Sequence, residues 1–221
     1  LHDAQALFGK LQHASFVVAQ GRKRLGSLRA FVASMSSSGA WSRHRASKQV
    51  FKDLQWWATA LSRASLRRSF ADDDEFDATY VACDASTSFG VGVFIDGAEL
   101  SLPVHPGWAT QDRDIAWLEA VAVEVALEVA AAKGISDCRL RINTDNTSVF
   151  FSERSGFSRN SAIMEVLARI RDLEAQYNIE VVPVLVPSAH NLADAPSRGY
   201  RHASPQLGRP KLHPALRKYF G

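Results

Sequence analysis

The spacing of apolar residues changes near residue 77. Over the first seventy residues apolar positions recur every three or four residues, which predicts helices. Beyond residue 77 they gather into short runs rich in β-branched and aromatic residues, as in strands. Asp96-Gly97 separates two of these runs and is a hairpin signal. The predicted helices cover residues 1–20, 25–35 and 50–61, and the predicted strands cover 79–86, 90–97 and 98–105.

The rest of the chain alternates between helical and strand patterns. The predicted elements are a helix at 114–133, a strand at 139–145, helices at 146–154 and 160–178, a strand at 179–187 and a short helix near 194. Strands joined by crossover helices imply a mixed sheet with helices packed on its faces. We therefore expect an α/β fold with a mixed five-stranded sheet flanked by helices, preceded by a small helical appendage. The expected divisions are a helical arm (1–70), an acidic linker (71–77), a domain (78–200) and a basic C-terminal tail (201–221).

The net charge of +3 hides a strong asymmetry. Residues 1–70 carry 12 Lys or Arg against 2 acids, residues 71–197 carry 8 against 21, and residues 198–221 carry 6 against none. An acidic centre between basic ends suits a metal-using enzyme on a polyanion, because acids hold cations while Lys and Arg contact phosphates. Solvated faces that serve solubility would explain the same charges.

The cysteines and the apolar stretches further limit the class of protein that this chain can be. The two cysteines, Cys83 and Cys138, lack neighbours at zinc-ligand spacing, so we expect buried free thiols. No apolar stretch reaches the roughly 18 residues of a membrane span, and the first residues lack the order of a secretory signal. We expect a cytoplasmic or nuclear protein that is not secreted and has no membrane partner. Trp56 and Trp57 lie on an amphipathic pattern, which favours a core role over base stacking.

Four carboxylates occupy unusual positions in this pattern. Asp84 and Asp145 each end a predicted strand, Glu119 lies inside an apolar helix, and Asp194 follows a proline-flanked loop. The residues one turn before and after Glu119 are all apolar, so its side chain points at the core or at a cleft floor. Its helix places Glu124 and Glu128 on the opposite edge, where we expect ordinary solvation.

Each of the four acids also has a purely structural interpretation. Glu119 could form a salt bridge from the helix to the sheet, with Arg139 or Arg141 as its partner. Asp145 and Asp194 could each cap the helix that follows. Any one acid is weak evidence, and the four together in this order are much stronger.

The segments around these acids resemble a known family. YVACDASTSFGVGVFI, IAWLEAVAVEVAL, INTDNTSV and HNLADAPSR are similar to the ribonuclease H domain of retroelement reverse transcriptases. The ending NLADAPSR is close to the form in DIRS-like (tyrosine-recombinase) retrotransposons. Residues 7–32 resemble the thumb or connection segment after the polymerase palm, and FKDLQWWATAL resembles the helix leading into the nuclease. The resemblance thus spans nearly the whole chain, although the paired aspartates of a palm are missing.

The resemblance implies a ribonuclease H-like fold and hydrolysis of the RNA strand of RNA–DNA hybrids during reverse transcription. It implies two Mg²⁺ ions, with Mn²⁺ as a substitute, held by Asp84, Glu119, Asp145 and Asp194. The implied partners are the hybrid and the polymerase portion of the same polyprotein. Two other functions stay open: a catalytically inactive binding or scaffold module, and a DNA resolvase or transposase nuclease on the same fold.

The chain departs from cellular members of this family at two points. Their loop histidine has only one counterpart here, His190, which we predict to be catalytic, although it could equally orient the backbone. Their basic handle helix is missing, so we expect hybrid binding to fall to the basic arm. The predicted nucleic-acid-binding residues are Arg22, Lys23 and Arg24 in the arm, Ser86, Thr87 and Asn146 beside the acids as contacts for 2′-hydroxyls, and Arg198.

Overall fold

A computed structural model describes residues 1–18, 20–37, 43–62, 76–200 and 203–220. The chain forms two compact units, one of residues 1–73 with 155–158, and one of residues 74–154 with 159–221. Residues 71–75 of the expected linker lie outside the described residues. Each unit has a hydrophobic core of its own, so each is considered separately.

The first unit is helical, as the apolar spacing predicts. It contains α1 (His2–Ala14), the 3₁₀ helix η1 (Gly21–Leu25), α2 (Gly26–Ser36) and α3 (Lys48–Leu61). Helix α3 begins where the side chain of Ser47 accepts a hydrogen bond from the N–H of Val50. Trp57 is almost fully buried in this unit's core and Trp56 packs edge-on against it, so the expected packing role is confirmed.

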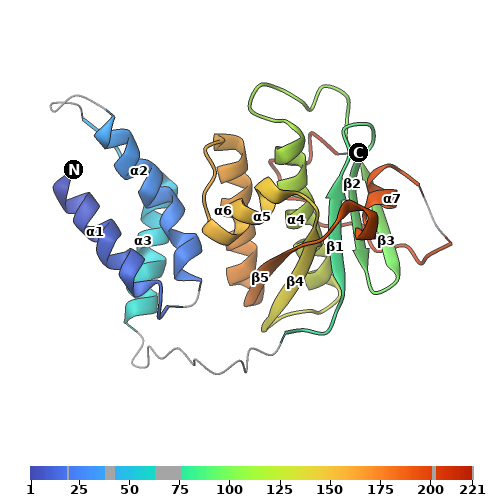
Figure 1. Cartoon of the computed structure of the whole chain (residues 1–221), viewed down its shortest axis with the longest axis horizontal. Coiled ribbons are helices and arrows are strands. Elements are labelled where there is room, and N and C mark those ends of the chain that lie inside the picture. Colours follow the sequence, from blue (N-terminus) through green and yellow to red (C-terminus); the bar gives the residue numbers. More distant parts are fainter. Residues whose placement is uncertain (19, 38–42, 63–75, 201–202, 221) are drawn as a thin grey trace. The chain divides into compact units, whose positions relative to one another are not determined.

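The second unit is built on one mixed sheet (Figure 1). Its strands are β1 (Val81–Ala85), β2 (Gly90–Ile95), β3 (Ala98–Pro103), β4 (Cys138–Thr144) and β5 (Ile179–Leu185), in the order β3-β2-β1-β4-β5. Strand β2 pairs antiparallel with β1 and β3, while β4 pairs parallel with β1 and β5. The expected α/β fold is confirmed, and its sheet has the arrangement of a ribonuclease H-like fold. Asp96 and Gly97 both have positive φ, as a tight hairpin turn requires.

Helices cover both faces of this sheet. They are α4 (Ile115–Ala132), α5 (Thr147–Ser155), α6 (Ser161–Tyr177), the 3₁₀ helix η2 (Ser188–His190) and α7 (Asp194–Ser197). Helices α4 and α6 pack together on one face, and α7 lies on the other (Figure 1). The side chain of Asp114 caps α4 by accepting the N–H of Trp117. Beneath α4 lies the buried free thiol Cys83, as expected, whereas the free thiol Cys138 is only half-buried.

The expectation for Glu124 is wrong. Its side chain is 2% exposed rather than solvated. The guanidinium of Arg169 on α6 donates to it from Nε to Oε1 at 2.8 Å and from Nη2 to Oε2 at 2.8 Å. The reason is that α4 is buried on nearly every side, between the sheet and α6, so its second edge faces another helix instead of water.

The basic tail also differs from expectation, because residues 203–220 are part of the second unit. Leu207, Leu216 and Phe220 belong to its core. Phe220 bridges Val104 just beyond β3, and the Tyr219 ring packs edge-on against Trp117 at the start of α4. At the other end, Phe76 and Asp77 of the expected linker pair with Arg139 on β4. The described part of this unit therefore runs from residue 76 to residue 220.

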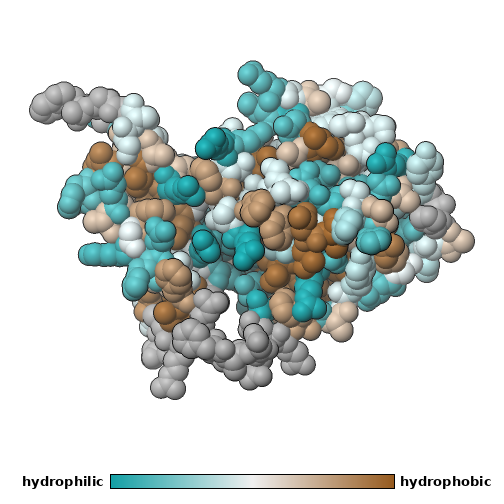
Figure 2. Space-filling model, in the orientation of Figure 1, coloured by the Kyte–Doolittle hydropathy of each residue, from teal (hydrophilic) through white to brown (hydrophobic). Residues whose placement is uncertain are grey.

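Some large apolar side chains are exposed on each unit. Figure 2 shows hydrophilic residues over much of the face it presents, with hydrophobic residues reaching the surface in places on both units. Among the described residues, Phe16 and Phe51 are the most exposed large apolar residues of the first unit, and Tyr200 and Phe151 are those of the second. Within the described ranges, no helix combines the length and apolar character that crossing a bilayer demands.

Candidate metal centre

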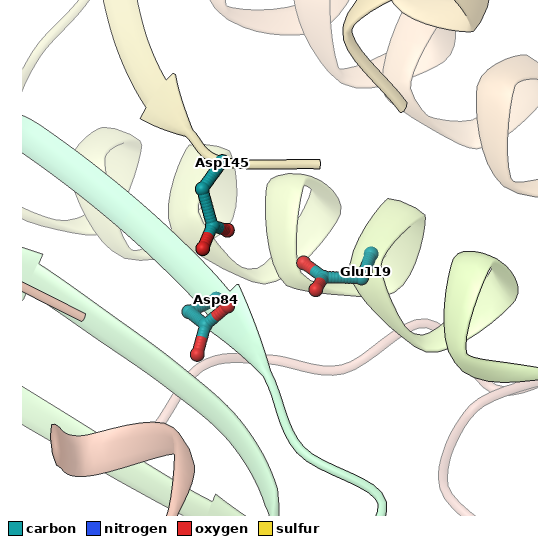
Figure 3. A group of neighbouring side chains, drawn as sticks. All are labelled: Asp84, Glu119 and Asp145. Carbon is teal, nitrogen blue, oxygen red and sulfur yellow. The ribbon is translucent and has the colours of Figure 1, made fainter. Parts of the chain in front are cut away.

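Three of the four acids meet at one end of the sheet. Asp84 is the fourth residue of β1, Asp145 directly follows β4, and Glu119 lies in the second turn of α4. Strands β1 and β4 are parallel neighbours, so their carboxyl ends lie side by side. One carboxylate oxygen from each acid lies within 4.8 Å of the other two. Figure 3 shows the three carboxylates converging, with Glu119 reaching toward the two aspartates.

The geometry excludes a salt bridge from Glu119 to the sheet. Arg139 Nε lies 3.2 Å from Glu180 Oε2, and the guanidinium of Arg141 lies 3.8 Å from the centre of the Phe76 ring. Among the described residues, Glu119 forms no ion pair with either arginine. The salt bridge to the sheet is therefore not made.

Asp145 is not the cap of α5. That role belongs to Asn146, whose Oδ1 accepts the N–H of Val149 at 3.0 Å. The Asn146 side chain also hydrogen-bonds Glu119. The carboxylate of Asp145 is thus available to the acid cluster rather than committed to the helix end.

The cluster carries more negative charge than its surroundings compensate. The pKa of Glu119 is raised from 4.5 to about 9, chiefly by burial and then by the neighbouring charges of Asp84 and Asp145, against hydrogen bonds from Asn146 and Ala85. Burial also raises the pKa of Asp84 from 3.8 to about 6. Glu119 and Asp84 are each 5% exposed. Within the described part of the chain, the buried Oε2 of Glu119 has no hydrogen-bond partner.

These features fit a bound cation. Unpaired carboxylate oxygens in a buried position are costly unless a cation or donors compensate them. A cluster that offers only oxygen atoms suits a hard divalent ion. The three acids can therefore hold a metal ion.

Asp194 lies apart from this group. It is the first residue of α7. Its Oδ1 accepts a hydrogen bond from Nε of Arg198 at 2.9 Å, and Nη2 of the same guanidinium lies 2.9 Å from it in an ion pair. Arg198 lies four residues later, one helical turn away, which favours this pairing. The negative charge of Asp194 still contributes to the raised pKa of Asp84, so it is close to the cluster. Among the described residues, its carboxylate accepts no N–H of the first turn, so Asp194 does not cap α7.

Two buried polar residues at the site were not singled out from the sequence. Asn191 donates from Nδ2 to Asp145 Oδ1 at 3.3 Å, and Ser197 donates from Oγ to Asp84 Oδ2 at 2.5 Å. Both stand three residues from Asp194, on either side, in the segment HNLADAPSR. Their positions three residues before and after a candidate metal ligand are the sequence signal by which they could have been predicted.

The other residues predicted near the acids are at the surface. His190 is exposed at the end of η2. Thr87 is exposed in the turn after β1, and the hydroxyl of Ser86 lies 2.8 Å from that of Ser88. These positions are accessible to a large ligand, and their roles stay predictions.

The basic cluster of the arm is only partly as expected. Arg22 is exposed, but Lys23 is buried and Arg24 is only 4% exposed. Nη1 of Arg24 lies 3.4 Å from Oδ1 of the buried Asp53 on α3, and its guanidinium lies over the Trp56 ring. Arg24 therefore neutralises a buried acid inside the helical unit, and its assignment to nucleic-acid binding is wrong, as is that of the buried Lys23.

Comparisons of the sequence with protein-family models and with curated proteins find no match.

Proposed function

We propose that this chain is a metal-dependent endonuclease that hydrolyses the RNA strand of RNA–DNA hybrids during reverse transcription of a retroelement, of the DIRS-like type. One observation carries the proposal: Asp84, Glu119 and Asp145 come from three separate elements and bring carboxylate oxygens within 4.8 Å of one another. They do so on a ribonuclease H-like sheet, at its carboxyl-end edge. The motif resemblance adds the substrate, an RNA–DNA hybrid, and the polymerase portion of the same polyprotein as a partner.

In this proposal the three acids hold Mg²⁺, with Mn²⁺ as a substitute, and Asp194 completes the set for two ions. An ion held by these residues would supply activation of a water nucleophile at neutral pH and neutralisation of charge on the leaving oxygen. The side chain of Asn146 favours the charged form of the Glu119 carboxyl, because its hydrogen bond lowers the pKa of that group. His190, exposed at the end of η2, is the candidate for proton exchange with solvent. Ser86 and Thr87 offer hydroxyls that can recognise the 2′-hydroxyl of RNA.

The test is a cleavage assay on the whole chain. Labelled RNA–DNA hybrid, duplex DNA and duplex RNA are each incubated with Mg²⁺ and, separately, with a chelator. We expect cutting of the RNA strand of the hybrid alone, and only with Mg²⁺. Binding of the hybrid without cutting would favour the inactive scaffold, and cutting of duplex DNA would favour a resolvase or transposase nuclease.

Matched variants tie the activity to the acids. Glu119→Gln and Asp145→Asn keep the shape of each side chain and remove its charge. We expect each to lower the cleavage rate by more than the roughly 10- to 100-fold typical of residues that only support a metal ligand. Glu128→Gln, on the same helix but half-buried and away from the cluster, should cut like the wild type. Full activity in Glu119→Gln would refute the assigned site.

A further inference from the structure

The loop that leads from β5 into α7 returns to the acid cluster and touches it with two side chains. Asn191 is 5% exposed and Ser197 is fully buried, although both are polar. Each hydrogen-bonds a different one of the three clustered acids. Buried polar side chains need hydrogen-bond partners. These contacts therefore fix the two polar side chains and the acids to which they donate.

Asn191 links three parts of the site through one amide group. Its Nδ2 donates to Asp145 Oδ1 at 3.3 Å and to the main-chain oxygen of Cys83, the residue before Asp84, at 3.1 Å. Its Oδ1 accepts the N–H of Ala193 at 3.1 Å. The end of β1, the acid after β4 and the loop before α7 are therefore held at fixed distances.

Ser197 reaches Asp84 because α7 lies unusually close to the sheet. Asp84 stands opposite Gly92 in the register of β1 and β2. A Cβ atom on Gly92 would lie 2.3 Å from the Ser197 nitrogen, so only glycine allows this approach. The Ser197 hydroxyl then donates to Asp84 Oδ2 at 2.5 Å, and its oxygen lies 2.8 Å from the Asp194 carbonyl oxygen.

We infer that Asn191 and Ser197 are positioning residues that each fix one oxygen of a metal-binding acid and leave the other for the cation. This inference rests on the proposed metal site. Figure 3 shows one oxygen of Asp84 directed away from Glu119 and Asp145, as expected if that oxygen is held from outside the cluster. Residues that hydrogen-bond metal ligands typically account for 10- to 100-fold in affinity for the ion. The segment that carries Asp194 thus also orients the acids of β1 and β4.

The experiment measures Mn²⁺ binding to the whole chain by the paramagnetic resonance of free Mn²⁺, without substrate or turnover. Asn191→Ala and Ser197→Ala should each weaken Mn²⁺ binding by about 10-fold or more. Ser188→Ala, at an exposed serine of the same loop, is the matched control and should bind like the wild type. The midpoint of urea unfolding in chelator is measured for each variant, and Mn²⁺ binding is compared only where every variant is folded.

The outcomes separate this inference from the proposed function. If the wild type binds Mn²⁺ and the Asn191 and Ser197 variants bind it more weakly, the positioning roles are supported. Folded variants that bind Mn²⁺ as tightly as the wild type overturn the positioning roles and leave the metal site standing. Loss of binding in Ser188→Ala equal to that in Ser197→Ala also overturns them, because the effect would then belong to the loop in general. A wild-type chain that binds no Mn²⁺ overturns the metal site and the positioning roles together.

Discussion

Gly92 lies directly opposite Asp84 in the antiparallel pairing of β1 and β2, and the backbone of α7 rests on it. A methyl group added there would meet the Ser197 nitrogen at 2.3 Å and the Ala193 oxygen at 2.4 Å, both of them main-chain atoms. Neither atom can move without displacing α7. The missing side chain of one residue thus sets the position of a helix that contacts the acid opposite.

Replacing this glycine should affect both stability and metal binding. Gly92→Ala should lower the free energy of unfolding by about 1–3 kcal/mol, the usual cost of overpacking, and weaken Mn²⁺ binding as well. Urea unfolding in chelator and Mn²⁺ titration measure the two effects. Gly208→Ala is the control, since a Cβ there meets nothing within 4 Å. A Gly92→Ala chain with wild-type stability and binding would show that α7 is not held in this way.

The raised pKa values of the cluster predict how stability depends on pH without metal. Glu119 and Asp84 have folded-state pKa values of about 9 and about 6, above their ordinary values of 4.5 and 3.8. A raised pKa means that the folded state binds the proton more tightly. The stabilisation is complete below the ordinary value and is lost as the pH rises through the folded value.

The free energy of unfolding in chelator should therefore fall as the pH rises from about 4 toward 9, by at most about 1.4 kcal/mol per pH unit for each proton. Glu119→Gln should flatten this fall above pH 6 or so, and added Mg²⁺ should raise the wild-type stability most at high pH. Urea unfolding at several pH values gives the difference between wild type and variant, which isolates this carboxyl group. A difference that does not change with pH would contradict the burial of an uncompensated acid.

The ion pair between Glu124 and Arg169 should matter for stability and not for metal binding. Glu124→Gln leaves the guanidinium of Arg169 without its bidentate partner between α4 and α6. Removing one member of a buried pair typically costs about 3–5 kcal/mol. We expect a loss of that order in urea unfolding, with unchanged Mn²⁺ affinity below the unfolding transition. Glu128→Gln, one turn along the same helix, should change stability much less, and equal losses in both would argue against a specific pair.

Neighbouring arginines of the arm should behave in opposite ways. Arg24→Ala leaves the buried Asp53 without its ion-pair partner, so it should destabilise the helical unit by about 3 kcal/mol. Arg22→Ala should change the free energy of unfolding by no more than about 0.5 kcal/mol. It should reduce the slope of log affinity for the hybrid against log salt concentration by about 1, as loss of one phosphate contact does. Thermal unfolding and hybrid titration at several salt concentrations separate the two. An unchanged salt slope in Arg22→Ala would remove the arm from the binding surface.

The fold could be predicted because its signals are local. The period of apolar residues distinguishes α4 from β1, and Asp96-Gly97 marks the hairpin, without any knowledge of tertiary contacts. The sequence also places Asp84 and Asp145 at strand ends, but it does not show which strands pair. The two acids meet because β1 and β4 are parallel neighbours, whose carboxyl ends lie at the same edge of the sheet.

What was missed depends on partners far away in the chain. The solvent side assigned to Glu124 was wrong because α6, some forty residues later, covers it with Arg169. Arg24 looked like part of a basic patch because its charge is visible in the sequence, whereas its pairing with Asp53, 29 residues away, is not. The role of Ser197 likewise needs a contact across 113 residues to Asp84.

The return of residues 203–220 to the sheet has a consequence for synthesis. Leu207, Leu216 and Phe220 complete the core of the second unit, and Tyr219 packs on Trp117 at the start of the helix that carries Glu119. A chain still emerging from the ribosome would leave these apolar surfaces open to water until residue 220 or so had been released. The clustered acids would leave the ribosome first, and the core that supports them would be completed only later. Premature termination after Asp194 should therefore yield an aggregation-prone product instead of a smaller folded domain.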